Sequence, residues 1–533
     1  MPTGAQVLVA CLEQAGVEVV FGLPGVHNLA AWEALRESSI RLVGVRHEQA
    51  AVYAADGYAR ATGRLGVALV TTGPGAANTL GATGEAWASG SPVLVIATDV
   101  PTGLRRAGVH RGSLHESTDQ AGMFAPVTKA RRSGVDALSA AHEALAAPQR
   151  PVYLEVATDL LVADAQPPPA VDDVAHAAPV PGDVEAAAAL LQAAQRPLVW
   201  AGGGALRAGA GAEVAALAEA IGAPVLTTYS ARGLVGDHPL AVGLPPHVPE
   251  AGRLWDAADV VVAIGSDLDG MMTQNWRMPA PPALVAVNVD PGDAGKNYPA
   301  DVTVAGDARV ATGRLVAAVD GGRAPWVELD ALRAAARRRL SAEHPAEMAF
   351  LEAFARGAGP EAVVLADMCI PGYWLAGFGA VAAPRRLQYP MGWGTLGYAF
   401  PASLGAACAG AGPVVSVSGD GGFLFACGEL ATVAQEQLPL TAVIVDDGGY
   451  GMLRFDQRQS GRETYGVDLH TPDFVALARS FGVRAQAVDG LGDAFAGALA
   501  EHVADPAPSV LVASAALEPP PTTSPRWYRS SRA

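Results

Sequence analysis

The sequence predicts an α/β protein built from three doubly wound parallel-sheet domains. Short runs rich in Val, Leu and Ile alternate with Ala-rich helical stretches along the chain, a pattern typical of parallel strands joined by crossover helices. The length of 533 residues corresponds to about three domains of roughly 100–200 residues each. Half of the residues are hydrophobic, which is enough to fill several buried cores.

Changes in composition divide the chain into three blocks. The predicted domains cover residues 1–165, 183–320 and 350–518, with a Pro- and Ala-rich linker over 166–182 and an irregular tail over 519–533. We expect one parallel sheet in each domain. The predicted strands cover 17–21, 42–46, 66–71 and 92–98 in the first block, 197–201, 224–227, 259–265, 284–289 and 302–304 in the second, and 362–366, 414–418 and 441–446 in the third.

Charge and cysteine usage narrow the class of protein. The net charge of −17 argues against a nucleic-acid or anionic-membrane partner, because either would require a basic face. The four cysteines form no CxxC pair, so neither a zinc site nor a disulfide framework is expected. Residues 1–20 lack the basic start of a signal peptide, and no apolar run is long enough to cross a membrane. We therefore expect a cytoplasmic protein.

The strongest motif lies in the third block. The predicted strand over 414–418 leads directly into Gly419-Asp420-Gly421-Gly422, and a helical segment is predicted over 423–437. The next predicted strand ends in the loop Asp446-Asp447-Gly448-Gly449-Tyr450-Gly451. Right-handed crossover makes the two strands parallel, so both loops are expected at the same edge of the sheet.

This arrangement brings Asp420 and Asp447 within reach of one cation. The glycines leave backbone N–H groups open at the start of a helix, which favours a phosphate. Two carboxylates together with phosphate oxygens form the usual environment of Mg²⁺. The alternative is an ordinary strand–turn–helix in which Gly-Asp only shapes the turn. The second acidic, Gly-rich loop favours a binding site.

On these residues the chain resembles the thiamine-diphosphate-dependent enzymes of the acetolactate synthase, pyruvate decarboxylase and benzaldehyde lyase type. Their cofactor motif begins with GDG and ends in a pair of asparagines. The resemblance implies a Mg²⁺ held by Asp420, Asp447 and the carbonyl of Gly449. The residues implied to line the cofactor in these two loops are Gly419, Gly421, Gly422, Tyr450, Gly451 and Met452.

The chain departs from this family pattern at Asp446-Asp447, where the family usually has two asparagines. Asp447 remains an oxygen ligand, but it adds negative charge beside a polyanion. We expect the metal to become more important for holding the diphosphate. The departure is also the main support for an alternative, a non-catalytic homologue.

Two more motifs extend the resemblance. Arg46-His47-Glu48 opens a predicted helix, and the family places such a glutamate against the aminopyrimidine ring of the cofactor, where it drives the tautomer needed for catalysis. In the stretch from Met391 to Gly397, the resemblance implies that Leu396 props the cofactor in a bent shape. The carbonyl of Gly394 is implied to accept from the pyrimidine amine. Without the resemblance, Glu48 would be a first-turn acid at a helix dipole and Leu396 a core residue.

The resemblance covers nearly the whole chain and gives the three domains their expected roles. It implies a pyrimidine-binding first domain, a Rossmann-like central domain and a diphosphate-binding third domain. Glu48 and Asp420 lie in different domains, and the family bridges such residues with the cofactor across a subunit interface. A homodimer or homotetramer is therefore implied.

The substrate side rests on two histidines. His27 follows the turn Phe21-Gly22-Leu23-Pro24-Gly25, and His115 stands where acetolactate synthases usually carry Gln. The resemblance implies that both face the reacting carbon and relay protons. A surface or capping role is the alternative for either.

The middle block bears on a second cofactor, FAD. Acetolactate synthases hold FAD at the place of Ala201-Gly202-Gly203-Gly204. The stretch 266–270 lacks the Arg that accompanies FAD in that family, so FAD is doubtful here.

Together these residues predict an acetolactate synthase-like carboligase, which decarboxylates a small 2-oxo acid and adds the resulting enamine to a carbonyl acceptor. A simple 2-oxo acid decarboxylase that releases an aldehyde is the alternative. A nicotinamide dehydrogenase is disfavoured because no complete GxGxxG with a downstream acid opens any block.

Overall fold

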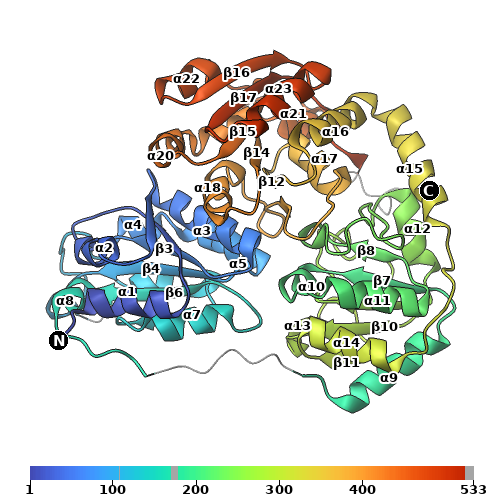
Figure 1. Ribbon diagram of the computed structural model, residues 1–533, viewed down its shortest axis with the longest axis horizontal. Helices are drawn as coiled ribbons and strands as arrows, with labels where there is room; N and C mark the ends of the chain where they lie inside the picture. The colour runs from blue at the N-terminus through green and yellow to red at the C-terminus, as the bar shows by residue number, and fades with distance from the viewer. Residues whose placement is uncertain (107, 170–177, 522–533) are drawn as a thin grey trace.

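Three parallel sheets organise the chain, as the sequence predicts. The computed structural model describes residues 1–106, 108–169 and 178–521. Figure 1 shows an N-terminal domain at the lower left, a middle domain at the lower right and a C-terminal domain above them. Every strand pairing within the three sheets is parallel. The predicted fold class is confirmed.

The N- and C-terminal sheets have the same topology. Their strand orders are β2-β1-β3-β4-β6-β5 and β13-β12-β14-β15-β17-β16. In both, the order reverses between the first and the third strand of the domain, and ligands of open α/β sheets bind beside such a reversal. The strands are β1 (Val19–Gly22), β2 (Arg41–Gly44), β3 (Gly66–Val70), β4 (Val93–Asp99), β5 (Ala130–Ser133) and β6 (Val152–Ala157), and then β12 (Val363–Ala366), β13 (Leu387–Gln388), β14 (Val414–Gly419), β15 (Leu440–Asp446), β16 (Arg484–Asp489) and β17 (Ser509–Ser514).

The middle sheet has five strands in the order β11-β10-β9-β7-β8. Four of its strands, β7 to β10, are buried along almost their whole length, which explains their near-continuous apolar sequences, whereas the edge strand β11 is mostly half-buried. They are β7 (Pro197–Ala201), β8 (Val225–Thr227), β9 (Val260–Ile264), β10 (Leu284–Asn288) and β11 (Val302–Ala305).

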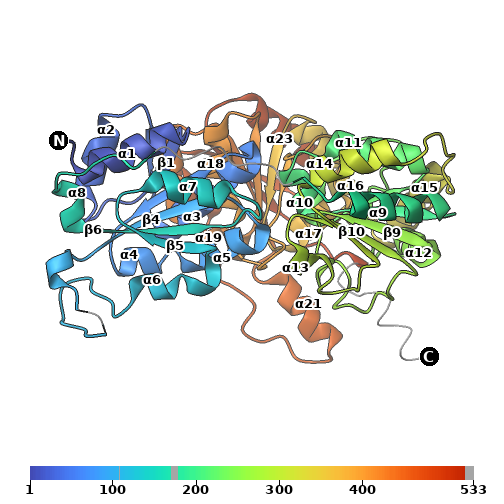
Figure 2. The same ribbon diagram turned by 90° about the horizontal axis from the view of Figure 1, so that it is seen from below.

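Helices connect the strands and cover the sheets (Figures 1 and 2). In the N-terminal domain they are α1 (Gly4–Gln14), α2 (Leu29–Arg36), α3 (Glu48–Thr62), α4 (Pro74–Ala77), α5 (Leu80–Ser89), α6 (Gln120–Met123), α7 (Ala137–Leu145) and α8 (Thr158–Val162). The middle domain contains α9 (Pro181–Ala193), α10 (Gly203–Arg207), α11 (Gly211–Ile221), α12 (Pro249–Ala257), α13 (Pro291–Ala294) and α14 (Ala308–Ala318). Then follow α15 (Leu329–Glu343), α16 (Pro345–Ala358), α17 (Ile370–Phe378), α18 (Ala399–Ala409), α19 (Asp420–Leu424), α20 (Leu430–Glu436), α21 (Gly451–Gln459), α22 (Phe474–Ser480) and α23 (Asp493–Ala504).

The N- and C-terminal domains are joined by a close crossing of α3 and α18. Residues of both helices belong to one hydrophobic cluster, which includes Tyr53 and Phe400. The helices approach closely because glycines stand at the crossing: a Cβ on Gly57 would overlap the carbonyl oxygen of Ala402, and one on Gly405 would overlap that of Ala54. The helix that begins with Glu48 is thus fixed against the C-terminal domain.

The structure differs from the sequence predictions in several elements. The strands β5, β6, β13, β16 and β17 were not predicted; β5 and β16 are polar edge strands, and β13 has only two residues. The helix predicted over 423–437 is interrupted, because a 3-10 turn at Cys427–Glu429 separates α19 from α20. Gly428 in that turn disfavours a continuous helix.

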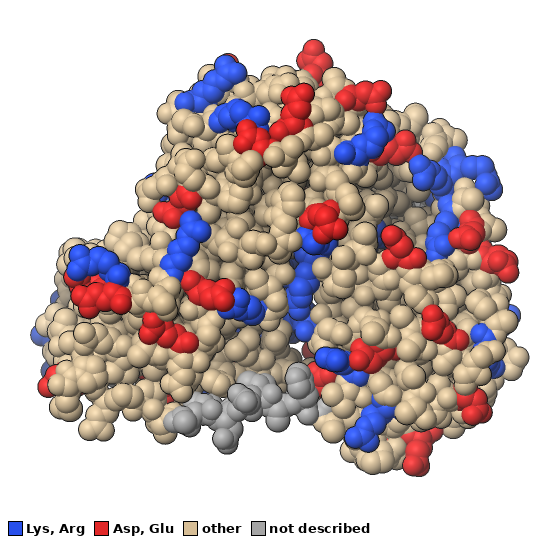
Figure 3. All heavy atoms as spheres, in the orientation of Figure 1, with Lys and Arg blue, Asp and Glu red and all other residues tan. Residues whose placement is uncertain are grey.

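The predicted domain boundaries remain predictions, although all three sheets fall inside them. Part of the predicted linker and the predicted tail from residue 522 onward lie outside the described residues. None of the helices in the described part of the chain is long and apolar enough to cross a membrane. On the face shown in Figure 3, acidic and basic side chains are interspersed.

The helix crossing generates a stability prediction. Gly405→Ala should lower the free energy of unfolding by about 1–3 kcal/mol, because the added methyl group has no space at the crossing. Chemical denaturation of the purified protein measures this change. Gly497→Ala is the matched control: Gly497 lies exposed in α23 with no atom close to its Cβ position, so this change should stabilise the protein by about 0.5–1 kcal/mol. Equal stability of Gly405→Ala and wild type would contradict the prediction.

Candidate active site

Glu48 is buried at the start of α3, and its carboxylate is held in a fixed orientation. It is 8% exposed. Asn78, directly after α4, donates a hydrogen bond from Nδ2 to Glu48 Oε2 at 3.0 Å. The backbone before it is fixed by the C-terminal domain, since the Glu429 carboxylate accepts from the amides of Arg46 and His47 at 2.9 and 3.1 Å. The second oxygen, Oε1, faces the Gly75 turn.

The two predicted histidines lie together at the same edge of the N-terminal sheet. The ring centroids of His27 and His115 are 5.4 Å apart. His27 Nδ1 lies 2.8 Å from Thr72 Oγ1, and that hydroxyl donates to Thr98 Oγ1 at 3.0 Å. Burial, and secondarily His115, lowers the pKa of His27. A neutral His27 is therefore favoured, which leaves a ring nitrogen able to take up a proton.

The backbone at His115 is unusual and explains one glycine. His115 has φ +69°, in the left-handed region that non-glycine residues rarely adopt. Its carbonyl oxygen occupies the space that a Cβ on Gly73 would need. His115 Nδ1 is buried and has no hydrogen-bond partner. The loop that carries His115 is thus packed directly against the turn after β3.

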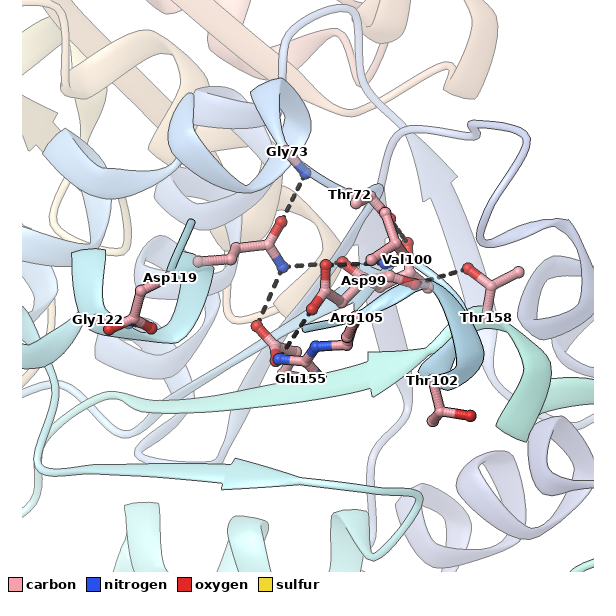
Figure 4. A network of polar contacts seen from close by, with 12 residues as sticks. Thr72, Gly73, Asp99, Val100, Thr102, Arg105, Asp119, Gly122, Glu155 and Thr158 are labelled. Carbon is pink, nitrogen blue, oxygen red and sulfur yellow. Dashed lines mark hydrogen bonds and ion pairs between the residues drawn. The ribbon is translucent and has the colours of Figure 1, made fainter. Parts of the chain in front are cut away.

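A polar network fixes the Gly73 turn (Figure 4). Gln120 is 2% exposed; its Oε1 accepts from the Gly73 amide at 2.6 Å, and its Nε2 donates to the Thr98 carbonyl at 2.9 Å. Arg105 bridges two buried carboxylates, with Nη2 3.0 Å from Asp99 and 2.8 Å from Glu155. Burial and the Asp99 carboxylate raise the pKa of Glu155. No sequence motif marks this network, because its members come from separate elements.

The two acidic loops of the C-terminal domain meet as predicted. Asp420 begins α19 and is 1% exposed. Its Oδ1 accepts from the Gly421 amide at 2.8 Å, whereas its Oδ2 is buried without a hydrogen-bond partner. Burial and the Asp447 and Asp446 carboxylates raise the pKa of Asp420 to about 7. The Tyr450 ring closes the contact between the loops, since a Cβ on Gly421 would lie 2.6 Å from it.

Asp447 has a cationic neighbour that the motif did not reveal. Arg454 on α21 donates from Nη2 to the Asp447 carbonyl at 2.9 Å and to Asp447 Oδ1 at 3.2 Å. Its Nε lies 3.0 Å from the Asp468 carboxylate. Burial raises the pKa of Asp447, and Arg454 opposes that shift. The extra charge of Asp447 is therefore partly compensated within the chain.

The remaining predicted residues of this domain surround the same loops. Gly419 ends β14, Gly449 has φ +153°, and a Cβ on Gly451 would overlap Asp447 Oδ2. Met452, on α21, packs at the edge of a hydrophobic cluster. Gly394 has φ +77° in the loop after Met391, and Leu396 Cδ1 lies 3.2 Å from the Cβ position of Gly422.

Among the described residues, no hydrogen bond or ion pair joins Glu48 to the Asp420 or Asp447 loop. Asn78 is the only side chain with a described hydrogen bond to the Glu48 carboxylate. The Asp420 loop contacts residues of its own domain. Each domain thus presents one half of a site at the carboxyl edge of its own sheet.

Three domain profiles of one family match the chain in the order of its sheets. They describe the N-terminal TPP binding domain of thiamine pyrophosphate enzymes (residues 2–123), the central domain (184–315) and the C-terminal TPP binding domain (369–513). The chain belongs to the thiamine pyrophosphate enzyme family.

Curated relatives of this thiamine pyrophosphate enzyme cover nearly its whole length. It is 37% identical to a probable 2-ketoarginine decarboxylase, AruI, of Pseudomonas aeruginosa over 90% of this chain and 88% of the relative. It is 32% identical to a probable acetolactate synthase large subunit of Methanocaldococcus jannaschii (91% and 87%) and 34% identical to an acetolactate synthase of Mycobacterium bovis (90% and 82%). The suspected family is thereby confirmed.

The residues of this thiamine pyrophosphate enzyme fit its cofactor, also called thiamine diphosphate. The unpartnered Asp420 Oδ2 lies at a loop of three glycines, where an anion-bound cation would satisfy it. Glu48 presents a carboxylate in the N-terminal TPP binding domain. No group of three or more His, Cys, Asp or Glu with metal-binding geometry occurs in the described part of the chain. A metal there would thus also depend on backbone and phosphate oxygens.

Several residues that shape this site were missed by sequence reasoning. Asn78, Gln120, Asp367 and Arg454 all act on a predicted residue or its loop through hydrogen bonds. A detectable signal existed only for Asp367, which directly follows the predicted strand over 362–366. The other three depend on contacts across loops.

The middle domain contains a cavity next to the glycines considered for FAD. Its volume is about 980 Å³, and its lining includes Gly203, Gly204, Arg207 and Asp267 together with Arg150 of the N-terminal domain. The glycines also have a packing role, because a Cβ on Gly204 would lie 2.8 Å from Gly265 Cα. The doubt about FAD stays a prediction.

Removing the buried charge of Asp420 should stabilise the cofactor-free protein but weaken cofactor binding. A raised pKa means that ionised Asp420 destabilises the folded chain; this cost is absent below its ordinary pKa of 3.8, grows as pH rises, and is complete above about 7. Asp420→Asn should therefore raise the free energy of unfolding of the cofactor-free protein at pH 8 by about 1–3 kcal/mol. The same variant should lose Mg²⁺-dependent thiamine diphosphate binding.

Denaturation at pH 4 and pH 8 measures the first effect, and calorimetry with thiamine diphosphate and Mg²⁺ measures the second. Asp493→Asn is the control, because Asp493 lies at an exposed surface ion pair and should change neither property appreciably. Unchanged cofactor affinity in Asp420→Asn would remove Asp420 from the candidate site.

Proposed function

We propose that this protein is a thiamine-diphosphate- and Mg²⁺-dependent carboligase of the acetolactate synthase type. It would decarboxylate a small 2-oxo acid and join the remaining fragment to a carbonyl acceptor. The observation that carries the proposal is the Glu48 carboxylate, buried and oriented by Asn78 at the carboxyl edge of a pyrimidine-binding domain. Relatives named acetolactate synthase support this reading.

In this proposal the metal is Mg²⁺, held by Asp420, Asp447 and the Gly449 carbonyl. Asp420 offers a buried oxygen without a partner, and Asp447 has a second carboxylate oxygen that Arg454 does not contact. Mg²⁺ favours oxygen ligands of this kind together with phosphate oxygens. The start of α19 favours the diphosphate, because the first amides of a helix have no partner within it; of these, the Gly421 amide already donates to Asp420 Oδ1.

Each half-site would then have its own chemical task. When bound, thiamine diphosphate supplies the electron sink that allows a 2-oxo acid to lose carbon dioxide. Glu48 would share a proton with a ring nitrogen of the pyrimidine through its carboxylate. His27, oriented by Thr72, and His115 would exchange protons with the substrate oxygen or carboxylate. Leu396 would fix the bent shape of the cofactor.

The assembly belongs to the proposal as well. Glu48 and Asp420 face the edges of different domains and share no described contact. A homodimer, or a homotetramer made of two such dimers, would allow the first domain of one protomer to complete the third domain of its partner. The cofactor would then lie at the subunit interface.

A simple decarboxylase is the second candidate, and the histidine pair favours it. His115 stands where acetolactate synthases usually carry Gln, and its ring lies 5.4 Å from that of His27. Two imidazoles at this place could deliver a proton to the reacting carbon and release an aldehyde. One relative is named a probable 2-ketoarginine decarboxylase.

The role of Glu48 is tested by Glu48→Gln. The amide keeps the shape but cannot hold the shared proton, so turnover of 2-oxo acids should fall at least about 100-fold, as expected for loss of an acid–base group. Steady-state kinetics measures turnover, and calorimetry should still detect cofactor binding. Glu33→Gln, at an exposed ion pair on α2, should retain full activity. Full activity in Glu48→Gln would contradict the assignment. If the wild-type protein binds the cofactor but turns over no 2-oxo acid, the non-catalytic homologue is indicated instead.

The product distinguishes the two candidate functions. Proton NMR after incubation with thiamine diphosphate, Mg²⁺ and a panel of 2-oxo acids including pyruvate should show a hydroxy ketone such as acetolactate. Free aldehyde as the main product would establish the decarboxylase instead. His115→Gln should raise the ratio of hydroxy ketone to aldehyde, because it removes a proton donor. His110→Gln, at an exposed position of the same loop, should leave that ratio unchanged.

A further inference from the structure

Asp367 is a buried carboxylate for which the proposed function has no task. It directly follows β12 and is 0% exposed. It lies beside the reversal of strand order between β12 and β14, which is the place where open α/β sheets bind their ligands. A fully buried carboxylate is costly unless hydrogen bonds stabilise it.

Its partners are three backbone amides, two of them from the loop that carries Leu396, and the Ser418 hydroxyl. The Gly397 amide donates to both carboxylate oxygens at 3.0 Å, and the Tyr398 amide donates to Oδ1 at 3.3 Å. The Met368 amide donates to Oδ1 at 2.9 Å. All of these partners are donors, so the site requires a group that only accepts. An ionised carboxylate meets that requirement and a side-chain amide does not.

The same carboxylate contacts the diphosphate loop. A Cβ on Gly422 would lie 2.8 Å from Asp367 Oδ2 and 3.2 Å from Leu396 Cδ1. Asp367, Leu396 and Gly422 therefore converge on one point. Gly397 has φ +84°, a conformation that turns its amide toward Asp367 and that glycine adopts without strain.

The N-terminal domain holds the other side of the Leu396 loop. Thr395 Oγ1 donates to Glu85 Oε2 at 3.0 Å, and Arg60 Nη1 donates to the Tyr389 carbonyl at 3.2 Å. Arg60 is itself paired with Asp56 at 2.7 Å and with Glu85 at 3.2 Å. Within the C-terminal domain, Asp367 hydrogen-bonds this loop and lies against Gly422 of the diphosphate loop, and the Phe425 side chain at the end of α19 also lies against Gly397.

We infer that Asp367 is a positioning residue that fixes the Leu396 loop against the Asp420–Gly422 loop, so that the thiamine half of the cofactor is held in register with its diphosphate half. The inference rests on the proposed roles of Leu396 and Asp420. Under this inference, the glycine loop binds the diphosphate, and the loop that Asp367 anchors determines the conformation of the thiamine half of the cofactor. Loss of Asp367 should therefore affect the two halves unequally.

Asp367→Asn is the test, with two ligands titrated by calorimetry in the presence of Mg²⁺. The amide places an N–H group against backbone N–H groups and leaves at least one buried donor unpaired. Affinity for thiamine diphosphate should fall by about tenfold or more. Affinity for inorganic pyrophosphate should stay within about twofold of wild type, since its glycine loop is intact. A general loss of fold would weaken both ligands.

Glu347→Gln is the matched control. Glu347 is another buried carboxylate of this domain that accepts a backbone amide, from Glu518 at 2.8 Å, away from both loops. It should leave the ratio of the two affinities unchanged. Leu396→Ala should reproduce the selective loss of thiamine diphosphate affinity, and the double variant with Asp367→Asn should show little further loss. Equal losses for both ligands in Asp367→Asn, or none, would overturn the inference.

Amide hydrogen exchange of the cofactor-free chain separates this inference from the proposed function. In wild type the Gly397 and Tyr398 amides should exchange slowly, and in Asp367→Asn residues 391–398 should exchange faster than the rest of the domain. Fast exchange of both amides in wild type would overturn the role of Asp367 even if the variant does not fold. Slow exchange together with no thiamine diphosphate binding by wild type would instead contradict the proposed function.

Discussion

One topological constraint underlies the candidate site: where parallel strands are joined by right-handed crossovers, the loops that follow the strands all lie at one edge of the sheet. The first and third domains use the same strand order, and each places its polar loops beside the reversal of that order. His27, Glu48 and Thr72 follow three different strands of one sheet, whereas Asp367, Asp420 and Asp447 follow or end three strands of the other. Residues far apart in sequence meet because the sheets bring them together.

The crossing of α3 and α18 couples these two edges. Gly57 and Gly405 allow the helix backbones to approach more closely than side chains would permit. The same interface brings Glu429 to the amides before Glu48, and Arg60 and Glu85 to the loop that carries Leu396. The orientation of the sheet edge that carries Glu48 is therefore a consequence of packing between domains as much as of the local sequence.

Buried carboxylates at the site differ in how their charge is stabilised. Glu155 has a cationic partner in Arg105, Asp367 has backbone amides and the Ser418 hydroxyl, and Asp420 has an oxygen with no hydrogen-bond partner among the described residues. Burial raises the pKa of all three. In the first two arrangements, groups of the chain itself stabilise the charge. The third is incomplete, and an incomplete buried carboxylate is the feature expected of a metal ligand.

The sequence by itself determined the fold class and the family. Continuous apolar runs predict buried parallel strands. Gly-Asp-Gly-Gly directly after such a run predicts an anion-binding turn, because the conformational freedom of glycine and the position of a helix start depend on the local sequence. Five strands were not predicted. Of these, β5, β13 and β16 are short or polar edge strands without that signal, whereas β6 and β17 are buried, apolar strands that carry it. The predicted helix over 423–437 was also wrong, because Gly428 lies in the turn between α19 and α20 and disfavours a continuous helix.

Only the tertiary structure decided which side chains support the site. Asn78 at Glu48, Gln120 at Gly73, Arg454 at Asp447 and Asp367 at Gly397 all act across loops that are distant or irregular in sequence. Neither residue periodicity nor motif spacing in the sequence predicts such a partner, because a hydrogen bond between loops depends on the positions of two backbones in space. The motifs specify the groups that do chemistry, and packing specifies the groups that hold them in place.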